Sequence, residues 1–216
     1  MSGKKTRAHR QTSRTQPAQR PAWRSWKLSL SGLAVAAVIT GSFVLPGKFS
    51  KSTTATGPAT GTGLAVGAKV PAFSEQGVAT STTISSRSLA GQRTLLFFSE
   101  GVMCQTCFEQ IKGLERLQGE LSARDIKLVS VTPDSPAELR QAISQYGITT
   151  PMIADDNRDM SQAFNVLGQG MHGDTPGHAF VLVKGGKVLW YRDYWLAPSR
   201  TMYVPPERVL NDLPAA

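Results

Sequence analysis

The feature that most constrains the fold is a short apolar run that leads into two cysteines and then into an amphipathic segment. Residues 94–98 read TLLFF, a run rich in aromatic side chains that is typical of a buried strand. Cys104 and Cys107 follow, three residues apart. Apolar residues then recur at intervals of three and four, which predicts one helix from about Cys104 to Ser122: Phe108, Ile111, Leu114, Leu117 and Leu121. Both cysteines therefore belong to the first turn of a helix that follows a strand.

The rest of the C-terminal part alternates in the same way. Residues 126–131 (IKLVSV) predict a second strand, and Ser135 predicts the N-cap of a helix that has Pro136 at its first position and ends at Gly147. The remaining predicted elements are a strand at 151–154, a helix at 159–167, a strand at 179–183, a turn at Gly185-Gly186, a strand at 187–190 and a helix at 206–213. Alternating strands and helices that end in a hairpin predict an α/β sandwich with a mixed central sheet.

The net charge of +9 is confined to the N-terminal part of the chain. Residues 1–63 hold ten Lys or Arg and no acidic residue. Residues 64–216 hold fourteen Lys or Arg against fifteen Asp or Glu, a balance of −1. Because the part that can fold is close to neutral, the composition gives no reason to expect a nucleic-acid partner.

A single membrane span is predicted near the N-terminus. Residues 28–45 carry no charge and would form a helix about 27 Å long, close to the ~30 Å of a hydrocarbon core. Basic residues are more numerous before it, in the tail of residues 1–27, so the positive-inside rule predicts a cytoplasmic N-terminus. A cleaved signal peptide and a buried core helix are the alternatives.

The segment after this predicted span is typical of a linker. Residues 46–66 are rich in Gly, Ser, Thr, Ala and Pro, which bury too little apolar surface to order a backbone. Residues 67–216 are enough for one domain. We therefore expect a single-pass protein of the cell membrane, with its folded domain outside the cytoplasm.

The cysteine pair is best interpreted as a redox centre. The first turn of a helix favours a thiolate, because backbone N–H groups and the helix dipole stabilise negative charge there. Cys104, nearer the helix end, is the expected nucleophile, and Cys107 is expected to resolve the mixed disulfide. A structural disulfide across so short a loop would stabilise by only about 2 kcal/mol. A zinc site would need four ligands, and only His172 and His178 remain. We predict neither a metal nor another cofactor.

A proline before the predicted hairpin completes a resemblance to a known fold. The order of strand, CxxC at a helix start and Pro176 before the strand at 179–183 resembles the thioredoxin-like superfamily, especially the extracytoplasmic redoxins of the alkyl hydroperoxide reductase and thiol-specific antioxidant (AhpC/TSA) type. The resemblance implies a thioredoxin-like α/β/α sandwich. It also implies that Pro176 is cis, lies against the cysteines and, with Thr175, binds an extended substrate segment.

Several family features are missing from this sequence. Peroxiredoxins carry a P-x-x-x-T-x-x-C loop, yet position 101 is Gly and no Pro occurs between Gly91 and Cys104. The family's arginine ahead of the hairpin strand also has no counterpart in residues 175–178. Both differences argue against a peroxidase.

Two further residues are candidates for moving a proton or tuning the thiols. Thioredoxin's buried Asp is replaced here by Phe98, which leaves Glu100 as the nearest carboxylate and the candidate proton acceptor for Cys107. As a turn residue, however, Glu100 is expected to be solvated. His178 adjoins the strand and is a stronger candidate than His172 for tuning the thiolate or binding copper; the alternative is a partly buried structural histidine.

The sequence thus predicts a membrane-tethered thiol–disulfide oxidoreductase whose partners are protein thiols or disulfides and an unidentified electron donor. One alternative is a thiol peroxidase with Cys104 peroxidatic and Cys107 resolving. Another is a copper-binding chaperone of the cytochrome oxidase assembly type, with Cys104, Cys107 and His178 as ligands. That family has three residues between its cysteines where this chain has two.

Overall fold

A five-stranded mixed sheet forms the centre of the molecule. The computed structural model describes residues 62–216, except 81, 197, 199 and 216. The strand order is β5-β4-β3-β6-β7, in which β3, β4 and β5 are parallel, β6 is antiparallel to β3, and β7 is antiparallel to β6. The strands are β3 (Arg93–Phe98), β4 (Ile126–Thr132), β5 (Met152–Ala154), β6 (Ala179–Lys184) and β7 (Lys187–Asp193). The predicted mixed α/β architecture is confirmed.

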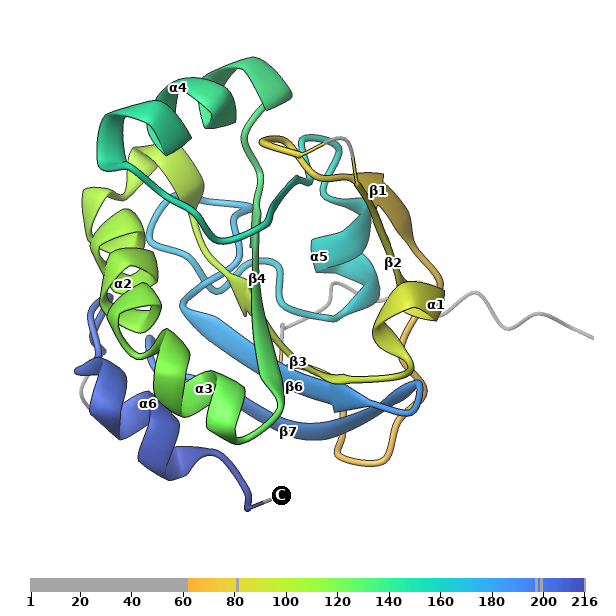
Figure 1. Ribbon diagram of the computed structural model, residues 1–216. Helices are drawn as coiled ribbons and strands as arrows, with labels where there is room; N and C mark the ends of the chain where they lie inside the picture. Colours follow the sequence, from red (N-terminus) through yellow and green to blue (C-terminus); the bar gives the residue numbers. More distant parts are fainter. Residues whose placement is uncertain (1–61, 81, 197, 199, 216) are drawn as a thin grey trace, which may run out of the picture. The chain divides into compact units, whose positions relative to one another are not determined.

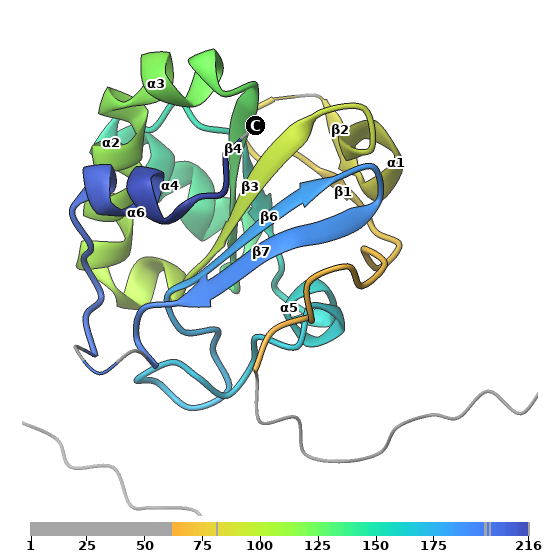
Figure 2. The same cartoon turned by 90° about the horizontal axis from the view of Figure 1, so that it is seen from below.

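Apolar layers cover both faces of this sheet because successive side chains of a strand point to opposite sides. Leu95 and Phe97 face one core, and Leu96 and Phe98 face the other. The first core is covered by α2 (Gln105–Arg116), α3 (Gln118–Ala123), α4 (Pro136–Tyr146) and α6 (Pro206–Asp212). The second is covered by α1 (Ser86–Leu89), α5 (Asp159–Ala163) and the small sheet of β1 (Ser74–Gln76) and β2 (Thr83–Ser85) (Figure 1). Figure 2 shows β3, β6 and β7 as neighbouring arrows between these layers.

The predicted ends of α4 are confirmed. The Glu138 carboxylate accepts the N–H of Ser135 at 3.0 Å, and the Ser135 hydroxyl accepts the N–H of Glu138 at 3.3 Å, which is a reciprocal capping box. Gly147 ends the helix at φ 60°, a conformation that glycine adopts without strain. Gly185 and Gly186 form the hairpin turn between β6 and β7, with φ of 60° and 70°.

The long helix predicted from Cys104 to Ser122 is wrong in one respect. It is divided at Leu117 into α2 and α3, because the Leu117 N–H bonds the Leu114 carbonyl three residues back and tightens the turn. The short elements α1, β1 and β2 were not predicted.

Two other expectations concern the backbone and the N-terminus. The cis peptide bond expected at Pro176 is not present, since no peptide bond between described residues is cis. The predicted span at residues 28–45 and the linker up to residue 61 lie outside the described residues. Within residues 62–216, as far as described, no helix is long and apolar enough to cross a bilayer.

Candidate active site

The two cysteines lie at the N-terminal end of α2, a few residues after the end of β3. Cys104 is the N-cap residue of α2, and its carbonyl accepts the Cys107 N–H at 3.0 Å. The preceding 3-10 turn η1 (Gly101–Met103) is closed by the Cys104 N–H on the Gly101 carbonyl at 2.9 Å. Both thiols are free, as expected for the reduced form of a redox pair. The predicted strand–CxxC–helix arrangement is confirmed.

A buried carboxylate fixes the turn in front of Cys104. Asp134 accepts the Val102 N–H at 3.0 and 3.1 Å through its two oxygens. Gly101 lies directly against this carboxylate with φ 70°, so a side chain at position 101 would collide with Asp134. Burial raises the pKa of Asp134. The glycine that breaks the peroxiredoxin loop pattern is therefore required by this turn.

The environments of the two thiols differ in a way that assigns their roles. The Cys104 side chain is 6% exposed and that of Cys107 is 0% exposed. A hydrogen bond from the Cys107 thiol, helped by the Cys107 N–H and the charge of His172, lowers the pKa of Cys104 against the opposing effects of burial and Glu100. Burial, followed by the interaction with Cys104, raises the pKa of Cys107 well above its ordinary value. Cys104 is thus the more acidic thiol of the pair, and Cys107 is the thiol that holds its proton more tightly.

Glu100 is buried, which corrects the expectation of a solvated turn residue. Its side chain is 0% exposed, and its carboxylate accepts the N–H of Met171, the N–H of His172 at 3.3 Å and the Thr175 hydroxyl at 3.5 Å. The Nδ1 of His172 lies 2.8 Å from its second oxygen. We call Glu100 and the loop of residues 170–175 that it binds the Glu100 latch. Glu100 and Cys104 cap the two ends of η1, and the charge of Glu100 disfavours ionisation of both cysteines, so the latch adjoins the cysteine pair.

The structure places the two histidines in different environments. His178 lies in the core, with its Nε2 3.3 Å from Gln110 Oε1 and its ring 4.7 Å from that of Phe97. Burial lowers the pKa of His178 to about 3, so the ring is neutral. His172, on the latch, is the histidine whose charge reaches Cys104. In the described part of the chain, no three His, Cys, Asp or Glu residues are grouped to hold a metal ion.

Of the two residues expected to bind substrate, Thr175 belongs to the loop of residues 170–175, and Pro176 follows it directly. Thr175 is 6% exposed and its hydroxyl also lies 3.3 Å from the His172 carbonyl. Pro176 is buried and follows a trans peptide bond. Their role in substrate binding stays a prediction.

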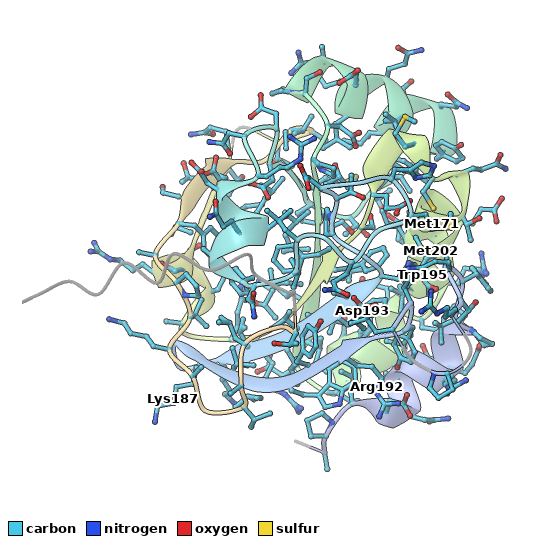
Figure 3. All side chains as sticks on the ribbon, turned by 180° about the vertical axis from the view of Figure 1, so that it is seen from behind. Met171, Lys187, Arg192, Asp193, Trp195 and Met202 are labelled. Carbon is cyan, nitrogen blue, oxygen red and sulfur yellow. The ribbon has the colours of Figure 1, made fainter. Side chains whose placement is uncertain are left out.

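Apolar side chains that the sequence did not single out surround the cysteines. Met202 and Trp195 pack against Cys104 and Cys107. Figure 3 shows Met171 at the same end of the molecule as Met202 and Trp195, opposite the end where Lys187 marks the hairpin turn. Three exposed residues also lie in the segments around the site: Met103 (65%), Met171 (51%) and Val102 (41%). Residues 171, 195 and 202 are too distant from residue 104 in sequence for any local pattern to reveal this grouping.

Comparisons with known proteins agree with this geometry. The sequence model of the AhpC/TSA family matches residues 66–191, more than half of the chain. The “Putative peroxiredoxin Rv2521” of Mycobacterium tuberculosis is 26% identical over 133 residues, which cover 59% of this chain and 84% of that protein.

Solved structures show the same fold at lower sequence identity. The peroxidoxin BcpB of Mycobacterium tuberculosis matches with a TM-score of 0.56 and 17% identity over 68% of this chain and 94% of that chain. A “putative Thiol:disulfide interchange protein DsbE” of Chlorobium tepidum matches with a TM-score of 0.51 and 20% identity over 60% of this chain and 86% of that chain. The expected thioredoxin-like fold is confirmed.

Proposed function

The chain belongs to the AhpC/TSA family, and from that premise we propose that it is a thiol–disulfide oxidoreductase that acts on protein substrates through Cys104 and Cys107. The observation that carries this proposal is the division of labour within the pair. The pKa of Cys104 is lowered at the start of α2, while that of the fully buried Cys107 is raised. Cys104 is therefore the more readily ionised thiol and the attacking residue, and Cys107 keeps its proton until it is needed.

The reaction then runs in two exchanges. The Cys104 thiolate attacks one sulfur of a partner disulfide, and the other partner sulfur leaves as a thiolate, which gives a mixed disulfide. Cys107 loses its proton, attacks Cys104 Sγ and releases the second partner thiolate, so that two electrons pass to the partner. Glu100 is the proposed proton acceptor for Cys107, because it is a buried carboxylate that adjoins both thiols. An external dithiol returns the pair to its reduced form, and the reverse sequence oxidises a partner.

Thiol peroxidase activity is the second candidate, and the peroxiredoxin-like relative favours it. In that reaction Cys104 takes an oxygen atom from a hydroperoxide to become a sulfenic acid and releases the alcohol or water. Cys107 then condenses with the sulfenic acid and releases water. The loop before Cys104 is a glycine turn held by Asp134, without the Pro and Thr of the peroxiredoxin loop. For this reason we place disulfide exchange first.

We further propose that the domain works outside the cytoplasm, tethered by residues 28–45. The support is the uncharged stretch of eighteen residues behind a basic leader. The partners would then be thiols or disulfides of exported proteins, and the electron donor would reach the domain from the membrane side.

The test compares both activities in the full chain. Reduction of insulin disulfides with dithiothreitol as donor is measured for the wild type, Cys104→Ser and Cys107→Ser, beside consumption of hydrogen peroxide with the same donor. We expect insulin reduction that depends on Cys104 and little peroxide consumption. Full insulin reduction by Cys104→Ser would disprove the proposal. Peroxide consumption that depends on Cys104, with no insulin reduction, would establish the peroxidase instead.

A further inference from the structure

We propose that His172 is the residue that tunes the reactivity of Cys104 and that Glu100 positions its imidazole, an inference that rests on the proposed redox role of the cysteine pair. His172 lies 68 positions after Cys104 in the chain. Neither Glu100 nor His172 lies in α2, the helix that begins at the cysteines.

The first step is the anchoring of the imidazole. Glu100 Oε2 lies 2.8 Å from His172 Nδ1, and Glu100 Oε1 accepts the backbone N–H groups of Met171 and His172. The carboxylate thus binds both the main chain and the ring of the same residue. Such an anchor orients a ring, because one nitrogen is fixed by the hydrogen bond and the other is directed away from it.

The second step is that the fold leaves little freedom for this loop. A Cβ on Gly170 would collide with the Thr175 hydroxyl and would lie 2.5 Å from Glu100 Oε1 and 2.9 Å from the Pro176 carbonyl. The Gly170 N–H also donates to the Thr175 carbonyl at 3.1 Å, which closes the loop on itself. Glu100 is 0% exposed, so the anchor itself is held by packing.

The third step is the balance of charge around the nucleophile. Glu100 caps the start of the three-residue turn η1 and Cys104 caps its end, so the carboxylate brings the imidazole that it holds to the neighbourhood of the thiol. There the charge of Glu100 disfavours a thiolate at Cys104 and the charge of His172 favours it, beside the hydrogen-bonding thiol of Cys107. Without a cation the buried carboxylate would be left to oppose the thiolate. The His172 side chain is 43% exposed, so its protonated form keeps contact with water.

The first experiment follows the ionisation of Cys104 in the reduced full chain. The rate of alkylation by iodoacetamide is measured against pH for the wild type, His172→Gln and His172→Lys. His172→Gln is expected to raise the midpoint by about 0.2 to 0.7 pH units, the range for a partly exposed ion pair. His172→Lys, which restores a cation, is expected to lower the midpoint again. The control Asp174→Asn removes an exposed charge from the same loop and is expected to leave the midpoint within about 0.2 units, below the lower end of the same range.

The result that would overturn this proposal is an unchanged midpoint in His172→Gln, or a His172→Lys midpoint equal to that of His172→Gln. The first would show that the imidazole charge does not reach the thiol. The second would show that the ring acts through packing and not through charge.

The second experiment tests the positioning by Glu100 through equilibrium with glutathione. His172→Gln is expected to shift the equilibrium about twofold to fivefold towards the Cys104–Cys107 disulfide, because the reduced form loses thiolate stabilisation. In a Glu100→Gln background the same substitution is expected to have no effect. Equal shifts in both backgrounds would overturn the positioning role. A wild-type protein that forms no reversible disulfide would instead refute the proposed function, so the two failures are distinguishable.

Discussion

The two ends of helix α2 each use a glutamate to hold a distant loop, yet they serve different purposes. At the C-terminal end, Glu115 Oε1 accepts the N–H and hydroxyl groups of Thr149 and Thr150 at 2.6 to 2.9 Å, and Lys112 Nζ lies 2.7 Å from Oε2. Burial alone would raise the pKa of Glu115, but these hydrogen bonds outweigh it and lower the pKa to about 2. Just before the N-terminal end, Glu100 binds the latch with a similar set of donors.

The difference lies in the chemistry of the neighbours. Around Glu115 the donors are amides, hydroxyls and a lysine. Around Glu100 they include an imidazole, and two thiols adjoin the carboxylate. A carboxylate that holds a loop is thus structural at one end of the helix and lies beside the proposed redox pair at the other.

The largest effect should come from the redox end. Cys107→Ser removes the resolving thiol, so Cys104 is expected to form a mixed disulfide that accumulates and stops turnover. The measurement is mass spectrometry of the protein after one exposure to glutathione disulfide, together with the insulin assay. Glu115→Gln, the matched change at the other end, should turn over at the wild-type rate. Continued turnover by Cys107→Ser would remove the functional contrast between the ends.

The second effect should come from the structural end. Glu115→Gln is expected to lower the free energy of unfolding by about 2 kcal/mol, because hydrogen bonds to a charged acceptor are replaced by weaker ones. The folded-state pKa of about 2 lies below the ordinary glutamate pKa of 4.5, so this contribution is present above pH 4.5 and disappears as the pH falls to 2. Urea denaturation at several pH values checks both statements. A difference between wild type and variant that does not shrink on acidification would contradict this assignment.

The third effect separates two glycines. Gly170→Ala is expected to destabilise the protein by about 1 to 3 kcal/mol, since its Cβ would meet Glu100, Thr175 and the Pro176 carbonyl. Gly119→Ala is its control. No atom lies within 4 Å of a Cβ there, and the residue is in α3, so alanine should stabilise by about 0.5 to 1 kcal/mol. Thermal unfolding gives both values. Equal changes in stability, of the same sign, for the two variants would show that the latch can accommodate a Cβ at position 170.

The smallest effect concerns access to the nucleophile. Met202 is 8% exposed and packs against the cysteines, which leaves Cys104 only 6% exposed. Met202→Ala is therefore expected to speed alkylation of Cys104 about threefold to tenfold, through a partly opened site and not through the thiol pKa. Alkylation measured across the pH range separates the two causes. A shifted midpoint with an unchanged plateau rate would contradict the expectation.

Local patterns in the sequence were enough to predict the central elements. The run TLLFF is β3, because an uninterrupted apolar stretch must be buried on both faces of a sheet. The ends of α4 followed from Ser135, Pro136 and Gly147, whose preferences depend on local backbone geometry. The placement of Cys104 and Cys107 at a helix start followed in the same way.

Features set by contacts between distant segments could not be predicted. Glu100 was expected to be a solvated turn residue, but in the fold the loop of residues 170–175 binds its carboxylate. His178 was preferred to His172 because it adjoins a strand, but that strand carries it into the core beside Gln110. The apolar periodicity of the long predicted helix continues through Leu117, so the pattern does not reveal the division there. The elements α1, β1 and β2 are too short to show a recognisable periodicity.

The most direct test of the central claim is a redox titration of the full chain. The protein is equilibrated with glutathione buffers of increasing oxidation, and the fraction with a Cys104–Cys107 disulfide is measured by trapping free thiols. We expect one reversible two-electron transition that is lost in both Cys104→Ser and Cys107→Ser. Absence of a reversible disulfide at any ratio of reduced to oxidised glutathione would contradict it.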